Sequence, residues 1–138
     1  IHMDDFYLPF DLREDCASCH MDFDRLILSV LLPHQESLPI NTFSYDAHQD
    51  KVKELTREDA HPLCIIEGSY SFHPKLRPYI DMSIALSIDE QTQKERIIQR
   101  SSEEIYEKFV SVWILKEKTY QKETNLLKNV DVVYKTNA

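Results

Sequence analysis

The stretch LCIIEGSY at residues 63–70 decides the predicted fold. It opens with an apolar run rich in β-branched residues, which predicts a short strand buried on both faces, as inside a parallel sheet. Glu67 follows this run directly, and Gly68 is the single glycine of the chain. Because ligands of open α/β sheets bind at the carboxyl edge of the strands, Glu67 is a candidate for site chemistry. The alternative is an acid that ends the strand and points to water.

The composition indicates one folded domain without a broad nucleic-acid-binding face. The chain has 138 residues, of which 42% are hydrophobic and 29% charged, so its apolar content suffices for a core. The net charge is -8 and no basic cluster interrupts it, which argues against a nucleic acid partner. The net charge does not exclude a small anionic substrate, because a few local arginines can bind one.

The three cysteines say less about function than the composition does. Cys64 lies in the apolar run and is predicted to be a small core residue. Cys16 and Cys19 form a C-x-x-C pair followed by His20. Because the sequence has no second C-x-x-C to complete a metal site, we expect two incidental thiols, with a metal or redox role as the alternative. No signal peptide and no apolar run near the length of a membrane span are present. We therefore expect a cytoplasmic protein, in a reducing compartment, without a membrane partner.

The N-terminal half is predicted to contain one helix and a long loop. Apolar residues at helical spacing indicate a helix over residues 22–32, capped by Asp22 and ended by Pro33. Residues 34–62 are polar and without a strong period, so we expect a loop there, with at most a short strand near Phe43 and Tyr45.

The C-terminal half alternates strands and helices. A second inner strand is predicted at 82–88 and a last strand at 130–134, with helices over 90–100 and from Ser101 or Ser102 to about Thr124. Asp89 is expected to cap the first of these helices, and Trp113 is expected in the core. This alternation predicts an α/β fold with a parallel sheet flanked by helices.

The chain also contains several short sequence motifs in a definite order. They are IHMDDFYLP at 1–9, HMDFDRL at 20–26, YDAH at 45–48, CIIEGSYSFHPKLR at 64–77, YIDMSIALSI at 79–88, ERIIQR at 95–100 and VDVV at 130–133. Together they resemble the uridine kinase and phosphoribulokinase group of P-loop small-molecule kinases. The resemblance implies an ATP- and Mg²⁺-dependent phosphotransferase that acts on a hydroxyl of a nucleoside-like molecule.

The resemblance implies roles for acidic residues. Asp4 matches the general base toward the acceptor hydroxyl and a neighbour of Mg²⁺, and Glu67 matches the acid that orients metal-bound water. Asp22 matches the acid that accepts hydrogen bonds from sugar hydroxyls. The simpler alternatives are a turn residue for Asp4 and a helix cap for Asp22.

Aromatic and basic residues receive roles in the same way. Tyr7 matches an aromatic residue of the acceptor pocket, and Tyr45 with His48 matches the pair that faces the base. Arg96 and Arg100 match lid arginines that clamp phosphate and stabilise charge during transfer. Alternatively, His48 is an exposed loop residue, and the two arginines are solvated charges on a helix.

The chain departs from this family at one decisive place. The N-terminal strand–loop–helix unit, with its glycine-rich phosphate loop, has no counterpart, and one glycine cannot form such a loop. We therefore expect the C-terminal portion of a P-loop kinase domain, inactive alone. The alternative is a non-catalytic ligand-binding or regulatory remnant of such a kinase. An unpaired sheet edge can pair with a second copy of the chain, so a homo-oligomer is an alternative to a monomer.

Overall fold

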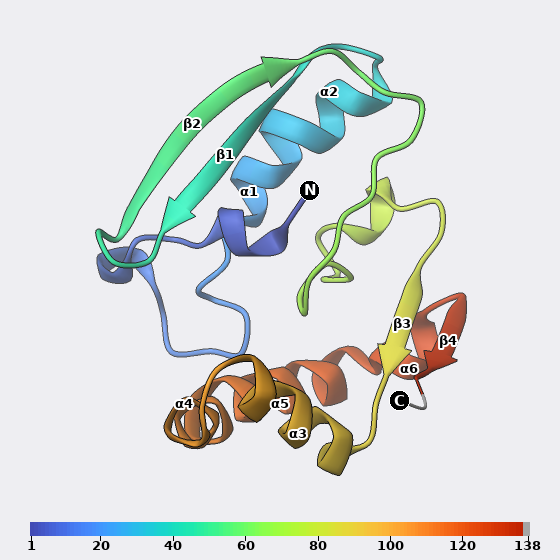
Figure 1. Cartoon of the computed structure of the whole chain (residues 1–138). Helices are drawn as coiled ribbons and strands as arrows, with labels where there is room; N and C mark the ends of the chain where they lie inside the picture. The colour runs from blue at the N-terminus through green and yellow to red at the C-terminus, as the bar shows by residue number, and fades with distance from the viewer. Residues whose placement is uncertain (137–138) are drawn as a thin grey trace. The chain divides into compact units, whose positions relative to one another are not determined.

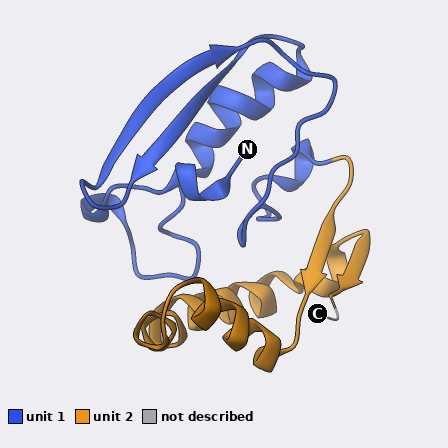
Figure 2. Ribbon diagram, in the orientation of Figure 1, with its two compact units in different colours: residues 1–80 blue, residues 81–138 orange. Residues whose placement is uncertain are grey.

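The computed structural model of the chain describes residues 1–136. The chain divides into two compact units, Ile1–Ile80 and Asp81–Ala138, which Figure 2 shows in blue and orange. The single domain expected over residues 1–138 stays a prediction. Throughout the described residues, no helix combines the length and the apolar character needed to cross a membrane.

A long helix lies beside the strands of unit 1 (Figure 1). It begins as α1, Phe23–Leu26, continues through a π-helical segment, Ile27–Leu31, and ends as α2, Leu32–Gln35. Asp22 caps it as predicted, because its carboxylate accepts a hydrogen bond from the Arg25 N–H at 3.0 Å.

The prediction that Pro33 ends this helix is wrong. Pro33 lies in the first turn of α2. A proline inside an α-helix removes one N–H and crowds the carbonyl four residues earlier. Here the preceding turn is π-helical, so its hydrogen bonds are displaced from the α-helical pattern and the helix continues past the proline.

Residues 34–62 contain a β-hairpin where mainly a loop was expected. β1, Ile40–Asp46, pairs antiparallel with β2, Lys51–Glu58. The Asp46 carboxylate closes the turn by accepting the His48 N–H at 2.9 Å. β2 reads KVKELTRE and is exposed along nearly its whole length, so it lacks the apolar alternation from which a strand is predicted.

The stretch at 63–67 is not the buried strand that its apolar run predicts. It makes one parallel bridge, between His2 and Glu67, and Leu63 and Ile65 are 72% and 66% exposed. In unit 1 its backbone pairs with the first residues of the chain: the Ile1 ammonium donates to the Ile65 carbonyl at 2.8 Å. The pairing is parallel but is too short to make 63–67 a strand, so the predicted strand and its burial are both wrong.

The core of unit 1 lies around the long helix and the 3₁₀ turn Met3–Phe6. Two further 3₁₀ turns span Phe10–Leu12 and Arg77–Tyr79. The buried apolar side chains of this unit are Met3, Phe6, Met21, Phe23, Leu26, Val30, Leu31, Ile40, Tyr70 and Leu76.

Unit 2 contains a short parallel pair. β3, Ile84–Ser87, lies beside β4, Val132–Lys135, which confirms two predicted strands over fewer residues. The expectation that the first of them is an inner strand is wrong, because Ile84 and Leu86 are 58% and 73% exposed. Asp131 ties the pair at its start, since its carboxylate accepts the Ser83 hydroxyl at 2.6 Å and the Ser83 N–H at 2.8 Å. These hydrogen bonds hold the pKa of Asp131 below its usual value.

The helices of unit 2 are close to the predicted ones. They are α3, Glu90–Arg100; α4, Glu103–Lys108; a π-helical segment, Phe109–Ile114; α5, Leu115–Thr124; and α6, Leu126–Asn129. Asp89 caps α3 through the Thr92 N–H at 2.9 Å, and Ser102 caps α4. Trp113 is only half-buried, and Tyr120 of α5 is the fully buried aromatic residue.

The fold class is therefore a mixed α/β arrangement of helices with small sheets. Across residues 1–136 the strands form two-stranded sheets, β1 with β2 and β3 with β4, and no continuous parallel sheet. The predicted sheet is thus correct in the direction of β3 and β4 and wrong in its extent.

Candidate functional site

The candidate site begins at the turn Met3–Phe6. Met3 and Phe6 are buried, three residues apart, and anchor the two ends of this 3₁₀ turn in the core. Asp4 between them is exposed and Asp5 is half-buried. The Tyr7 hydroxyl donates to the Asp4 carboxylate at 3.5 Å. The turn therefore presents Asp4 to solvent beside the hydroxyl of Tyr7.

Glu67 lies in the chain segment that pairs with residues 1–3 at the start of this turn. The Met3 N–H donates to the Glu67 carbonyl at 2.9 Å, and the Glu67 N–H donates to the Ile1 carbonyl at 3.0 Å. Glu67 thus ends one of two adjacent parallel segments, and Asp4 follows the other at the same end. The exposed Glu67 carboxylate is hydrogen-bonded to Nδ1 of His2.

Arg25 braces the turn and was missed by sequence reasoning. Its guanidinium donates to the backbone carbonyls of Asp5 and Tyr7, each at 3.1 Å, and to the Asp22 carboxylate at 3.0 Å. It also lies over the rings of Phe6 and Phe43, at 4.8 and 5.0 Å from their centroids. The only sequence signal for it is the i,i+3 spacing from Asp22.

Asp22 is thus both a helix cap and an ion-pair partner. Its side chain is 25% exposed and that of Arg25 is 14% exposed. A carboxylate has about four acceptor positions, and Arg25 uses two of them. The remaining capacity is compatible with the predicted role toward sugar hydroxyls, which stays a prediction.

Tyr7 and Tyr45 lie together, and their predicted role in binding an acceptor stays a prediction. Their ring centroids are 5.4 Å apart. The Tyr45 hydroxyl accepts from Arg13 at 2.7 Å and donates to the Asp50 carboxylate at 2.6 Å. The Arg13 guanidinium lies over both tyrosine rings and, at 4.1 Å, over the ring of Phe10. Sequence reasoning did not find Arg13.

Two pKa shifts belong to this cluster. Desolvation raises the pKa of Tyr45, and its hydrogen bond to Asp50 adds to the rise, partly opposed by Arg13. Desolvation by itself would raise the pKa of Asp50. Hydrogen bonds from the Tyr45 hydroxyl and the Phe10 N–H outweigh it and hold this pKa below its usual value. Tyr45 is therefore a neutral hydroxyl beside an ionised carboxylate at neutral pH.

The other residues predicted for the site are exposed. His48 is exposed in the hairpin turn, three residues after Tyr45. Arg96 and Arg100 are exposed on α3 in unit 2, one helical turn apart. Their roles stay predictions.

The C-x-x-C pair is a disulfide between Cys16 and Cys19, so the expectation of two incidental thiols is wrong. His20 beside it is 2% exposed, stacks on Tyr7 and meets Tyr70 edge-on. Among residues 1–136, no group of three or more His, Cys, Asp or Glu side chains could hold a metal ion.

The carboxylates of Asp4 and Glu67 are of the ligand type that Mg²⁺ takes, but they supply only part of its coordination shell. Mg²⁺ keeps several waters and takes only one or two carboxylates together with substrate phosphates. Two exposed carboxylates that follow neighbouring segments match that donor set.

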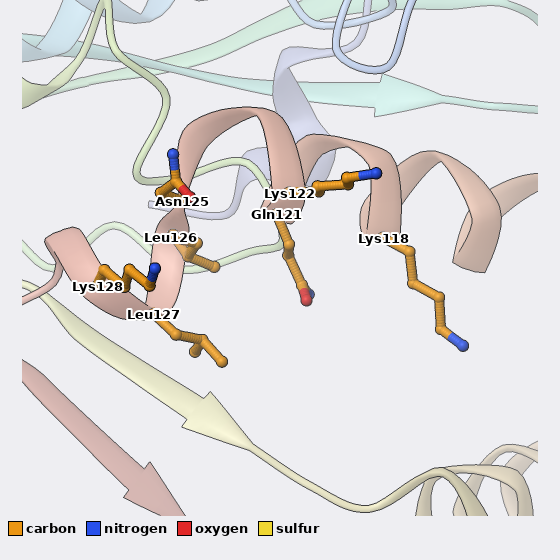
Figure 3. A pocket seen from close by; sticks show the side chains of 7 residues that line it. All are labelled: Lys118, Gln121, Lys122, Asn125, Leu126, Leu127 and Lys128. Atoms are coloured by element: carbon orange, nitrogen blue, oxygen red, sulfur yellow. The ribbon is translucent and has the colours of Figure 1, made fainter.

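A hollow of about 310 Å³ lies on unit 2, along α5 and α6 (Figure 3). Its lining residues are Lys118, Gln121, Lys122, Asn125, Leu126, Leu127 and Lys128. Lys118 is paired with the Glu90 carboxylate at 2.5 Å. The hollow contains none of the residues that the sequence predicts for the site.

Comparison with solved structures supports the fold. The chain is similar to the structure of a possible uridine kinase from Bacillus stearothermophilus, with a TM-score of 0.71 and 20% sequence identity over 97% of this chain and 70% of that chain. At this identity the likeness shows a uridine kinase-like fold and not an activity. No family model matches the sequence, and no curated protein matches it.

Proposed function

We propose that the chain carries the acceptor-binding part of an ATP-dependent phosphotransferase that acts on a hydroxyl of a nucleoside-like molecule. The observation that supports this most is the parallel pairing of residues 1–3 with 65–67, which brings Asp4 and Glu67 to the same end of adjacent segments. The uridine kinase-like fold points the same way.

Asp4 is proposed as the general base. It is exposed on a turn whose two ends are buried and whose carbonyls are held by Arg25. A carboxylate fixed in this way can accept the proton of an acceptor hydroxyl as that oxygen attacks. The Tyr7 hydroxyl donates to the Asp4 carboxylate at 3.5 Å and so lies beside the proposed base.

Asp4 and Glu67 are proposed to contact Mg²⁺ through their oxygens, with His2 orienting the Glu67 carboxylate. When bound with ATP, the ion would offset negative charge on the phosphates. On α3, Arg96 and Arg100 present guanidinium groups on neighbouring turns, a spacing that suits a phosphate ligand.

The acceptor is proposed to be a planar base on a sugar. The rings of Tyr7 and Tyr45 offer stacking surfaces, and Asp22 and Asp50 offer carboxylate acceptors for hydroxyl or amino groups. His48, in the turn that follows Tyr45, is proposed to face the base.

A second function is favoured by one observation. The single glycine, Gly68, serves the packing of Met3, so the chain has none left for a phosphate loop. A module that binds the acceptor without phosphorylating it would need only the Tyr7–Tyr45 cluster.

Two measurements distinguish these functions. Isothermal titration of the 138-residue chain with uridine tests the acceptor cluster, with a Tyr45→Ala variant as the control. Transfer of the γ-phosphate of ATP to uridine by the complete gene product tests the enzyme. Transfer supports the phosphotransferase, binding without transfer supports the module, and neither binding nor transfer contradicts both.

A further inference from the structure

The C-x-x-C pair is a motif that the proposed phosphotransferase does not use. Cys16 is exposed and Cys19 is half-buried, so a thiol from solution can reach the disulfide at Cys16 Sγ. We propose that Cys16 and Cys19 form a reversible thiol–disulfide exchange site that controls how the loop of residues 8–20 is held on Tyr45.

The loop is closed at its base by backbone pairing. The Leu8 N–H donates to the His20 carbonyl at 2.9 Å, and Tyr7 forms an antiparallel bridge with Met21. The disulfide joins residues 16 and 19, with their Cα atoms 5.2 Å apart, directly before this base. It therefore constrains the chain between the tip of the loop and its closing pair.

The tip of the loop is docked by a few polar contacts. Arg13 donates through Nε to the Leu8 carbonyl at 2.7 Å and through its guanidinium to the Tyr45 hydroxyl. The Phe10 N–H donates to the Asp50 carboxylate at 2.8 Å. These contacts hold the loop only as long as they outweigh the conformational entropy that it would gain on release.

The exchange needs a thiol reductant, either a monothiol such as glutathione or a dithiol. A reductant thiolate attacks Cys16 Sγ, the bond between the two cysteines breaks, and Cys19 leaves as a thiolate that takes a proton from water. A second thiol then attacks the mixed disulfide, which oxidises the reductant and releases Cys16. Two electrons and two protons pass to the pair, and a disulfide of the same reductant reverses the reaction.

Opening the disulfide removes a covalent constraint from the loop, so more released conformations become accessible. The Arg13 contacts with Leu8 and Tyr45 would then open more often. The peptide bond after Arg13 would become a substrate for trypsin, which requires a free arginine side chain in an extended backbone.

The first test counts thiols. The 138-residue chain is equilibrated with reduced and oxidised glutathione in one arm and with reduced and oxidised dithiothreitol in the other, then alkylated in denaturant and weighed by mass spectrometry. Of its three cysteines, we expect only Cys64 to be alkylated after oxidation and all to be alkylated after reduction, reversibly. Three alkylated cysteines after oxidation in both arms would overturn the proposal.

The second test is limited trypsin digestion of the oxidised chain, the reduced chain freed of reductant, and the Cys16→Ser variant. We expect cleavage after Arg13 to be roughly tenfold faster in the latter two and cleavage after Arg100 to stay constant. Ser18→Ala, within the same turn, should behave like the oxidised chain. Equal rates at Arg13 in all samples would refute control of the loop, and neither test needs phosphotransferase activity.

Discussion

Met3 occupies the space in which a side chain at Gly68 would begin. A Cβ atom on Gly68 would lie 2.6 Å from Cβ of Met3, well inside van der Waals contact. Gly68 also has φ 133°, a conformation that other residues rarely adopt. The single glycine of the chain therefore lets the turn that carries Asp4 pack against the segment that carries Glu67.

Gly68→Ala is expected to destabilise unit 1 by about 2–4 kcal/mol, because it adds both backbone strain and a clash with Met3. Chemical denaturation measures the free energy of unfolding. Leu63→Ala, at a 72% exposed position of the same segment, should change it by less than about 0.5 kcal/mol. Equal effects of the two substitutions would show that the close packing at Gly68 is not needed.

Arg25→Lys is expected to destabilise unit 1 by about 1–3 kcal/mol. A lysine cannot span the Asp22 carboxylate and the carbonyls of Asp5 and Tyr7 as the planar guanidinium does. The matched control is Lys75→Met, which removes the exposed pair with Asp24 and should cost little in the same denaturation experiment. A stable Arg25→Lys variant would contradict the bracing role.

His73 gives unit 1 a pH dependence. Its ring stacks on Phe23 at 3.9 Å, and burial, followed by the charges of Lys75 and Arg77, lowers the pKa of His73 below 6.5. The unfolded chain then binds more protons in acid, so stability is present above pH 6.5 and is lost as the pH falls through the folded pKa.

The corresponding measurement is unfolding free energy against pH. His73→Phe keeps an aromatic ring for the stack and should flatten the loss between about pH 6.5 and 5. His61→Phe, at an exposed position, should keep the wild-type slope. Identical slopes in all three proteins would exclude His73 as the source.

Local signals predicted the structure best. The caps Asp22 and Asp89 were recognised, and the third cap was narrowed to Ser101 or Ser102, because the capping side chain and the first turn lie within a few residues. The helix over 90–100 was predicted with its observed bounds for the same reason. These features depend on neighbouring residues and not on what packs against them.

Features that depend on distant residues were predicted less well. β2 carries charge on both faces, so its pairing with β1 leaves no periodic signal. The run at 63–67 was expected to be buried, yet burial needs partners on both sides and this segment has only residues 1–3 beside it in unit 1. Arg13 and Arg25 were missed because their partners lie up to 32 residues away.

Asp4 is proposed to remove the proton of the acceptor hydroxyl. The most direct measurement is the rate of phosphate transfer from ATP to uridine by the complete gene product carrying Asp4→Asn, compared with Asp5→Asn. Asp5 accepts the Tyr45 N–H at 3.3 Å, a bond that an asparagine can also accept. We predict that Asp4→Asn lowers kcat by about 10²-fold or more with KM nearly constant, while Asp5→Asn stays close to wild type. An Asp4→Asn protein with wild-type kcat would contradict the account.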